Sequence, residues 1–183
     1  MPSYELYEHA GCVPFADWKA KGIEIPVFDK DGTLTHANQL EFVDEVIEGL
    51  KQQQLSSMYP SIGVPSNNHS MEHVRAFAEK LESELDVSVF AICRGQGYKG
   101  KPSIEMGLAI ARHFDVRLDQ LGVIGDRRLT DVRFGRKLGV GAIALCKKAG
   151  EGDTKWVPSL RRVEAVIVGT ERFAKVAIPS PGY

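Results

Sequence analysis

The fold of this chain is decided by one stretch of sequence, Val27-Phe28-Asp29-Lys30-Asp31-Gly32-Thr33-Leu34-Thr35. The apolar side chains within residues 23–28 lead into it and predict a short buried strand, which Pro26 interrupts. Asp29 therefore lies at the carboxyl end of a strand, where open α/β sheets place their ligand crevice. Gly32 permits a sharp turn, so that Asp29 and Asp31 can both point into one pocket.

Two carboxylates this close repel each other unless a cation or a shared proton relieves the repulsion. A divalent metal ion would do so, and a carboxylate held in this way can attack phosphorus while its neighbour works as acid and base. The alternative is an Asp-Gly turn between a strand and a helix, which involves no chemistry. On this stretch alone both interpretations stay open.

Composition predicts a single domain over residues 1–183, because 183 residues with 43% hydrophobic side chains suffice for one core. Lysine and arginine total 23 against 24 acidic residues, which argues against nucleic acid as a partner. The longest uncharged apolar stretch, residues 138–146, is too short to cross a bilayer, so we expect no transmembrane segment.

Three cysteines that lack the spacing of a metal site or a disulfide framework, Cys12, Cys93 and Cys146, favour an intracellular, reducing compartment. Residues 1–9 contain two glutamates and no arginine. We therefore expect neither a secretory signal nor a transit peptide there.

Helices and strands are expected to alternate along the chain. Helices are predicted from Asn38 to about Gln54, from Ser70 to about Leu85, from Ser103 to Phe114, and from Thr130 to just before Gly139. Strands are predicted at residues 61–65, 87–92, 121–124, 140–145 and 165–168. Residues 147–162 read as a polar loop. Such alternation predicts an α/β fold with a parallel sheet and helices on both faces.

The carboxyl ends of parallel strands meet at one edge of the sheet, and four of them carry reactive or polar side chains. These are Asp29 with Asp31, Ser66 with Asn67, Lys101, and Asp126 with Asp131. Each has a structural interpretation as well: Ser66 as a turn hydroxyl, Lys101 as a solvated lysine, and Asp126 as a helix cap.

The order of these groups resembles the haloacid dehalogenase superfamily of phosphatases over about residues 23–146, the expected catalytic core. Asp29-Lys30-Asp31-Gly32-Thr33-Leu34-Thr35 is similar to its first motif, Ser66 to its second, Lys101-Pro102 to its third, and 125–131, Gly-Asp-Arg-Arg-Leu-Thr-Asp, to its fourth. Within the superfamily the motifs most resemble the small phosphatidylglycerophosphate phosphatases of mitochondria and bacteria. The resemblance implies a Rossmann-like three-layer sandwich without a cap domain.

The resemblance also implies roles for the site residues. Asp29 would be the nucleophile, Asp31 the acid and base, and Ser66 with Lys101 would hold the phosphoryl oxygens. Mg²⁺ would be held by Asp29, Asp126, Asp131 and the backbone carbonyl of Asp31. Asn67, Arg94 and Arg127 are candidates for contact with substrate, and Lys99 is a further one. The sequence does not separate these four from ordinary polar residues of the surface.

Three other functions stay open at the level of sequence. Residues 95–102, Gly-Gln-Gly-Tyr-Lys-Gly-Lys-Pro, fit a nucleotide-binding phosphate loop except at Pro102, which lacks the hydroxyl for Mg²⁺. A phospho-acceptor receiver domain also combines acidic residues with Lys-Pro, but its acceptor lies in mid-chain. A catalytically silent interaction subunit is the third, and the intact Asp29, Asp31 and Asp126 argue against it.

The spacing of the motifs leaves no room for a cap domain, since 36 residues separate Asp29 from Ser66 and 34 separate Ser66 from Lys101. An uncapped crevice favours a phosphate carried by something large: a lipid headgroup at a membrane surface, a protein, or a substrate enclosed by a partner subunit.

Among these three kinds of substrate, the resemblance favours the lipid headgroup. It therefore also implies contact with the membrane surface. It also implies the matrix side of the mitochondrial inner membrane in a eukaryote and the cytoplasm in a bacterium. Val13, Phe15 and Trp18, beside Lys19 and Lys21, are the predicted docking patch. The alternative is that these apolar side chains cover the edge of the sheet.

Overall fold

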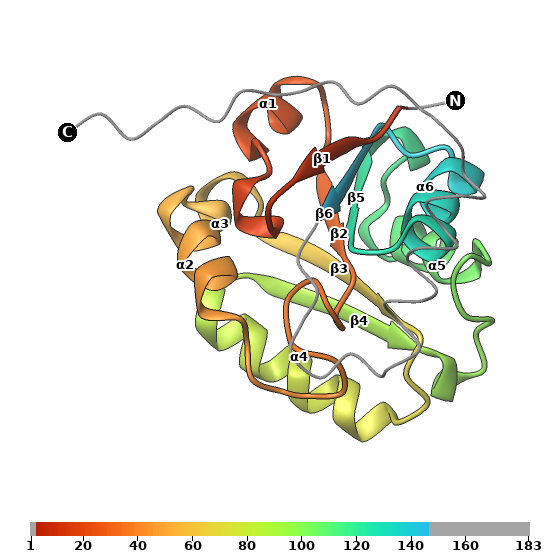
Figure 1. Cartoon of the computed structure of the whole chain (residues 1–183). Coiled ribbons are helices and arrows are strands. Elements are labelled where there is room, and N and C mark those ends of the chain that lie inside the picture. The colour runs from red at the N-terminus through yellow and green to blue at the C-terminus, as the bar shows by residue number, and fades with distance from the viewer. Residues whose placement is uncertain (1–2, 147–183) are drawn as a thin grey trace.

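The computed structural model describes residues 3–146, which form one six-stranded parallel sheet in the order β1-β6-β5-β2-β3-β4 (Figure 1). The strands are β1 (Glu5–Tyr7), β2 (Ile25–Phe28), β3 (Ser61–Ser66), β4 (Ser88–Cys93), β5 (Leu121–Gly125) and β6 (Ala142–Cys146). β2, which leads into Asp29, lies between β5 and β3. The predicted parallel sheet is confirmed.

Helices cover both faces of the sheet, so the described chain has three layers (Figure 1). One face is covered by η1 (Ala10–Cys12), α1 (Phe15–Ala20), α2 (Asp44–Gln52), α3 (Leu55–Met58) and α4 (Met71–Leu85). The other is covered by α5 (Glu105–Phe114) and α6 (Arg133–Leu138). Short helical turns η2 (Arg94–Gln96), η3 (Leu118–Gln120) and η4 (Arg128–Val132) lie in the connections.

The strands divide their side chains between two hydrophobic cores, because successive residues of a strand point to opposite faces. In β2, Val27 packs in the core under α5 and α6, and Phe28 packs in the core under α1–α4. In β6, Ile143 and Ala144 divide in the same way. This burial on both faces explains why the strands read as continuous apolar runs in the sequence.

The predicted membrane-docking patch is wrong, since its three apolar residues are buried. Val13 and Phe15 are 0% exposed and Trp18 is 3% exposed. Phe15 packs against Trp18, Phe28 and Tyr59 with ring centroids about 6 Å apart. The segment before β2 therefore belongs to the hydrophobic core.

The helix predicted from Asn38 begins later, at Asp44, and ends at Gln52. Asn38 adopts a left-handed conformation with φ of 60°, and its backbone N–H donates to Asp31 Oδ1 over 2.9 Å. Thr35 and Phe42 form an isolated bridge across this loop. The backbone of Asn38 is thus bonded to Asp31 of the first motif in a left-handed conformation, so no helix begins at Asn38.

The remaining predicted elements are present with small shifts. α4 is capped by the Ser70 hydroxyl, which accepts from His73 N, as expected. α6 begins at Arg133 after the π-helical turn η4 and ends at Leu138, and the C-cap residue Gly139 has a φ of 76°. The strand predicted at residues 165–168 lies outside the described residues. Within residues 3–146, no helix has the length and apolar character that crossing a bilayer requires.

Candidate active site at the carboxyl edge of the sheet

Three carboxylates converge where β2 and β5 end. Asp29 follows β2, Asp126 follows β5, and Asp131 lies in the turn η4. Each offers one oxygen within 4.8 Å of the others' oxygens. The predicted meeting of these distant residues at one edge of the sheet is therefore observed.

Two glycines make room for these carboxylates. Gly32 has φ of +83°, and a Cβ there would lie 2.4 Å from Asp126 Oδ2. A Cβ at Gly125 would lie 2.3 Å from Asp131 Cγ. The turn after β2 thus needs glycine for its backbone conformation and for its close approach to Asp126. Gly125, whose role the sequence analysis missed, is required by packing alone.

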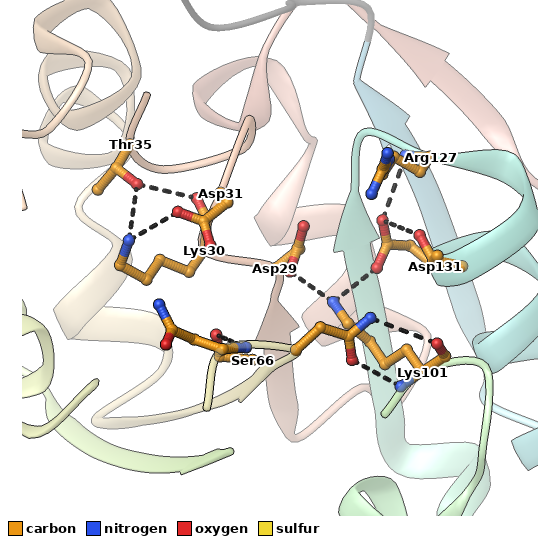
Figure 2. Close-up of polar contacts among 11 residues, drawn as sticks. Asp29, Lys30, Asp31, Thr35, Ser66, Lys101, Arg127 and Asp131 are labelled. Atoms are coloured by element: carbon orange, nitrogen blue, oxygen red, sulfur yellow. Dashed lines mark hydrogen bonds and ion pairs between the residues drawn. The ribbon is translucent and has the colours of Figure 1, made fainter. Parts of the chain in front are cut away.

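Lys101 lies between two of the carboxylates, as Figure 2 shows. Its Nζ donates to Asp29 Oδ1 over 2.5 Å and to Asp131 Oδ1 over 2.7 Å. Burial disfavours the ammonium ion, but the charges of Asp131 and Asp29 outweigh it and raise the pKa of Lys101 above its ordinary value. The pKa of Asp29 is raised to about 6, chiefly by burial, with Lys101 opposing the rise and Asp131 adding to it. A buried ammonium group thus lies between two carboxylates and offsets part of their negative charge.

The side-chain amide of Asn67 bonds both backbone groups of Lys101, its N–H and its carbonyl oxygen. Its Oδ1 accepts from Lys101 N over 2.7 Å, and its Nδ2 donates to Lys101 O over 3.3 Å. Its amide thus has a positioning role that the sequence did not reveal, because the two residues lie 34 positions apart. The predicted contact of Asn67 with substrate stays a prediction.

Asp31 points away from the three-carboxylate cluster, toward Lys30 and Thr35 (Figure 2). Its Oδ1 accepts from Lys30 Nζ over 2.7 Å and from Asn38 N over 2.9 Å. Its side chain is therefore not part of the cluster, and only its backbone carbonyl remains as the predicted metal ligand. Lys30 is fully buried, which the sequence analysis did not anticipate for a lysine between two aspartates.

The other predicted site residues surround this arrangement. Ser66 ends β3, is buried, and accepts from Asn68 N over 3.2 Å, which leaves its O–H able to donate elsewhere. Arg127 donates its backbone N–H to Asp131 Oδ2 over 3.2 Å. The Arg94 side chain is exposed near Asn67. The roles of these side chains toward substrate stay predictions.

The phosphate-loop alternative is not supported by the geometry of residues 95–102. The lysine of that pattern, Lys101, directs its ammonium group to Asp29 and Asp131. The following helix begins only at Glu105. The segment therefore delivers a lysine to the carboxylate cluster.

A parallel three-layer fold with this edge is typical of the phosphatases of the haloacid dehalogenase superfamily. The sequence profile of the mitochondrial PGP phosphatase family matches residues 11–149, and the chain belongs to that family. The recognised superfamily, the fold class and the assignment as a phosphatase are thus confirmed.

Solved structures are similar in fold. An uncharacterised protein from Corynebacterium glutamicum is 19% identical, with a TM-score of 0.51 over 81% of this chain and 94% of the other. A p-nitrophenyl phosphatase from Archaeoglobus fulgidus is 13% identical, with a TM-score of 0.49 over 77% and 92%. A HAD-superfamily hydrolase from Ehrlichia chaffeensis is 17% identical, with a TM-score of 0.46 over 70% and 60%. No curated protein sequence matches this chain.

Proposed function

We propose that this chain is a Mg²⁺-dependent phosphatase with Asp29 as nucleophile, and that it converts phosphatidylglycerophosphate to phosphatidylglycerol and phosphate. The observation that carries the proposal is the convergence of Asp29, Asp126 and Asp131 beside the Lys101 ammonium group. Membership of the mitochondrial PGP phosphatase family supports the choice of substrate.

The donor set suits magnesium, which prefers oxygen ligands and is commonly held by a few carboxylates. Asp29, Asp126 and Asp131 would hold the ion, together with the backbone carbonyl of Asp31. When bound, Mg²⁺ would offset the negative charge of the phosphoryl group and of the carboxylates around it.

The chain's own residues would carry the two displacement steps. A carboxylate oxygen of Asp29 attacks phosphorus, the bond from phosphorus to the substrate oxygen breaks, and the Asp31 carboxyl group gives its proton to the leaving alkoxide. Asp31 then takes a proton from water, whose oxygen attacks phosphorus and frees Asp29 with release of phosphate. Ser66 and Lys101 hold the phosphoryl oxygens throughout.

A site without a cap domain favours a phosphate carried by a lipid at a membrane surface. Within the described residues, the intervals between Asp29, Ser66 and Lys101 contain only the helices and strands of the core itself. A substrate that is part of a surface does not need to be enclosed by a cap. With this substrate we place the protein at the matrix side of the inner membrane in a eukaryote, or in the bacterial cytoplasm, with residues 1–183 as one domain.

The test is phosphate release in the presence of Mg²⁺ from phosphatidylglycerophosphate in vesicles and, side by side, from glycerol 3-phosphate. We expect the lipid to be hydrolysed at a kcat/KM well above that of the soluble ester. Asp29→Asn should lose turnover roughly 10⁴-fold or more while staying folded, because an amide cannot form the acyl phosphate. Retained turnover in purified Asp29→Asn protein would exclude this nucleophile. Equal rates on the two substrates would exclude the lipid preference and leave a phosphatase of another phosphomonoester.

A further inference from the structure

Lys30, between the two aspartates of the first motif, has an unusual environment for a lysine. Its side chain is 0% exposed. Its Nζ donates to Asp31 Oδ1 and to the Gln39 carbonyl oxygen, each over 2.7 Å. It also lies 5.4 Å from the centre of the Phe77 ring. A buried ammonium ion is tolerated only with partners of this kind, so Lys30 is fixed in one arrangement.

The Asp31 carboxylate is held from the same side by two donors. Besides Lys30, the backbone N–H of Asn38 donates to the same Oδ1 oxygen. In Figure 2, Lys30 and Thr35 lie on one side of Asp31, and Asp29 with Lys101 lies on the other. The side chain of Asp31 is 29% exposed, and the two hydrogen bonds to its Oδ1 oxygen hold it in this orientation.

We propose that Lys30 is a positioning residue that sets the orientation of the Asp31 carboxyl group for proton transfer. The inference rests on the proposed function, in which Asp31 protonates the leaving alkoxide. Lys30 touches neither the three-carboxylate cluster nor any group proposed to bind phosphate. Lys30 Nζ bonds Asp31 Oδ1, Thr35 Oγ1 and the Gln39 carbonyl oxygen. Only Asp31 among these has a proposed role in the reaction, so we expect the contribution of Lys30 to pass through Asp31.

This role predicts a dependence on the leaving group. An alkyl phosphate releases a basic alkoxide that needs a proton, whereas p-nitrophenyl phosphate releases a stable anion that does not. A misplaced Asp31 should therefore slow alkyl esters far more than aryl esters. The parameter kcat/KM reports only the steps up to departure of the leaving group, so the later hydrolysis of the aspartyl-phosphate does not enter.

The experiment measures kcat/KM with Mg²⁺ for glycerol 3-phosphate and for p-nitrophenyl phosphate in Lys30→Met, in Asp31→Asn and in the unchanged protein. We expect the ratio of alkyl to aryl kcat/KM to fall at least roughly tenfold in both variants, within the range that a general acid contributes. The ratio does not depend on the fraction of enzyme that is folded, so a partly unfolded preparation still gives a valid value. Lys30→Gln, which keeps one donor group, is the second variant and should give an intermediate ratio.

Lys80 provides the matched control. Its Nζ donates to the Leu40 carbonyl oxygen over 3.1 Å and lies 5.1 Å from the centre of the Phe42 ring. It therefore anchors the same 36–42 loop through a carbonyl and a ring, without contact to Asp31. Lys80→Met should leave the alkyl-to-aryl ratio unchanged, whereas a role of Lys30 in loop anchoring alone would give the two variants equal ratios.

The outcomes separate the inference from the proposed function. If the ratio falls in Asp31→Asn but not in Lys30→Met, Lys30 does not position the acid and the inference is overturned alone. If the ratio stays unchanged in Asp31→Asn, the acid role of Asp31 is itself wrong. If Lys30→Met adds a further fall in the ratio to Asp31→Asn in the double variant, Lys30 acts by a route other than Asp31.

Discussion

At the scale of single residues, two glycines with the same backbone conformation have different surroundings. Gly22 and Gly32 have φ of +85° and +83°. A Cβ at Gly22 would meet nothing within 4 Å, whereas one at Gly32 would lie 2.4 Å from Asp126 Oδ2. Replacing both by alanine therefore separates the cost of the backbone conformation from the effect on the carboxylate cluster.

Gly22→Ala and Gly32→Ala should each lower the free energy of unfolding by about 1 to 2 kcal/mol, the cost of a left-handed conformation for an L-residue. Only Gly32→Ala should also raise the Mg²⁺ concentration needed for half-maximal activity, by roughly tenfold, because it displaces a proposed ligand. Urea unfolding and Mg²⁺ titration of activity measure the two effects. An equal Mg²⁺ requirement in the two variants would contradict the placement of Asp126 at the metal.

The site residues that the sequence predicted are those whose positions follow from strand ends. Asp29, Lys101 and Asp131 could be placed together because parallel strands end at one edge. The burial of Lys30 could not be foreseen, since its partner at Gln39 depends on the path of the loop after the motif. The same holds for Asn67, whose two bonds reach the backbone of Lys101.

At the scale of elements, helix α1 carries part of the core in place of the predicted membrane patch. Trp18 is 3% exposed, and a Cβ at Gly122 of β5 would lie 2.3 Å from its ring. The indole therefore packs directly on the backbone of the sheet, at a point where glycine is required.

Trp18→Ala should lower the free energy of unfolding by about 3 to 5 kcal/mol, as loss of a large buried aromatic side chain does. Lys21→Ala, at the exposed end of the same helix, should change it by no more than about 0.5 kcal/mol. Denaturant unfolding measures both values. A Trp18→Ala protein of unchanged stability that binds vesicles less tightly would restore the docking patch instead.

The helices and strands were predicted best where apolar periodicity is long. Helix α4 has this pattern over 15 residues and a serine cap, and the sequence located it correctly. Helix α2 was predicted to start too early because Asn38 has a left-handed backbone conformation and its backbone N–H donates to Asp31. The three-residue strand β1 was not predicted at all, since it is too short to show a period.

At the scale of the whole molecule, the carboxylate cluster makes stability depend on the metal. Three carboxylates with oxygens within 4.8 Å repel one another, and Lys101 offsets only part of this charge. A cation bound by the folded state alone stabilises it through mass action. Binding of Mg²⁺ at the proposed site should therefore change the free energy of unfolding as well as the activity.

Mg²⁺ at about 100 times its Kd should raise the free energy of unfolding by about 2.7 kcal/mol and the Tm by several degrees, and excess EDTA should abolish both this shift and turnover. In Asp126→Asn the shift should shrink, because one proposed ligand of the ion is lost. Thermal unfolding with and without Mg²⁺ measures this. Full turnover in EDTA would remove the metal from the mechanism.

The order of the strands in the sheet also determines when each strand can pair during synthesis. β1 pairs within the described sheet only with β6, where Glu5 lies opposite Ala144 and Tyr7 opposite Cys146. At synthesis rates of about 5 to 20 residues per second, β6 is therefore synthesised on the order of ten seconds after β1, and β1 cannot pair in the sheet before then. Pairing across so much sequence closes slowly, and β1 joins a sheet whose other five strands are already available. We therefore expect the first strand to be synthesised to be among the last to pair in the sheet.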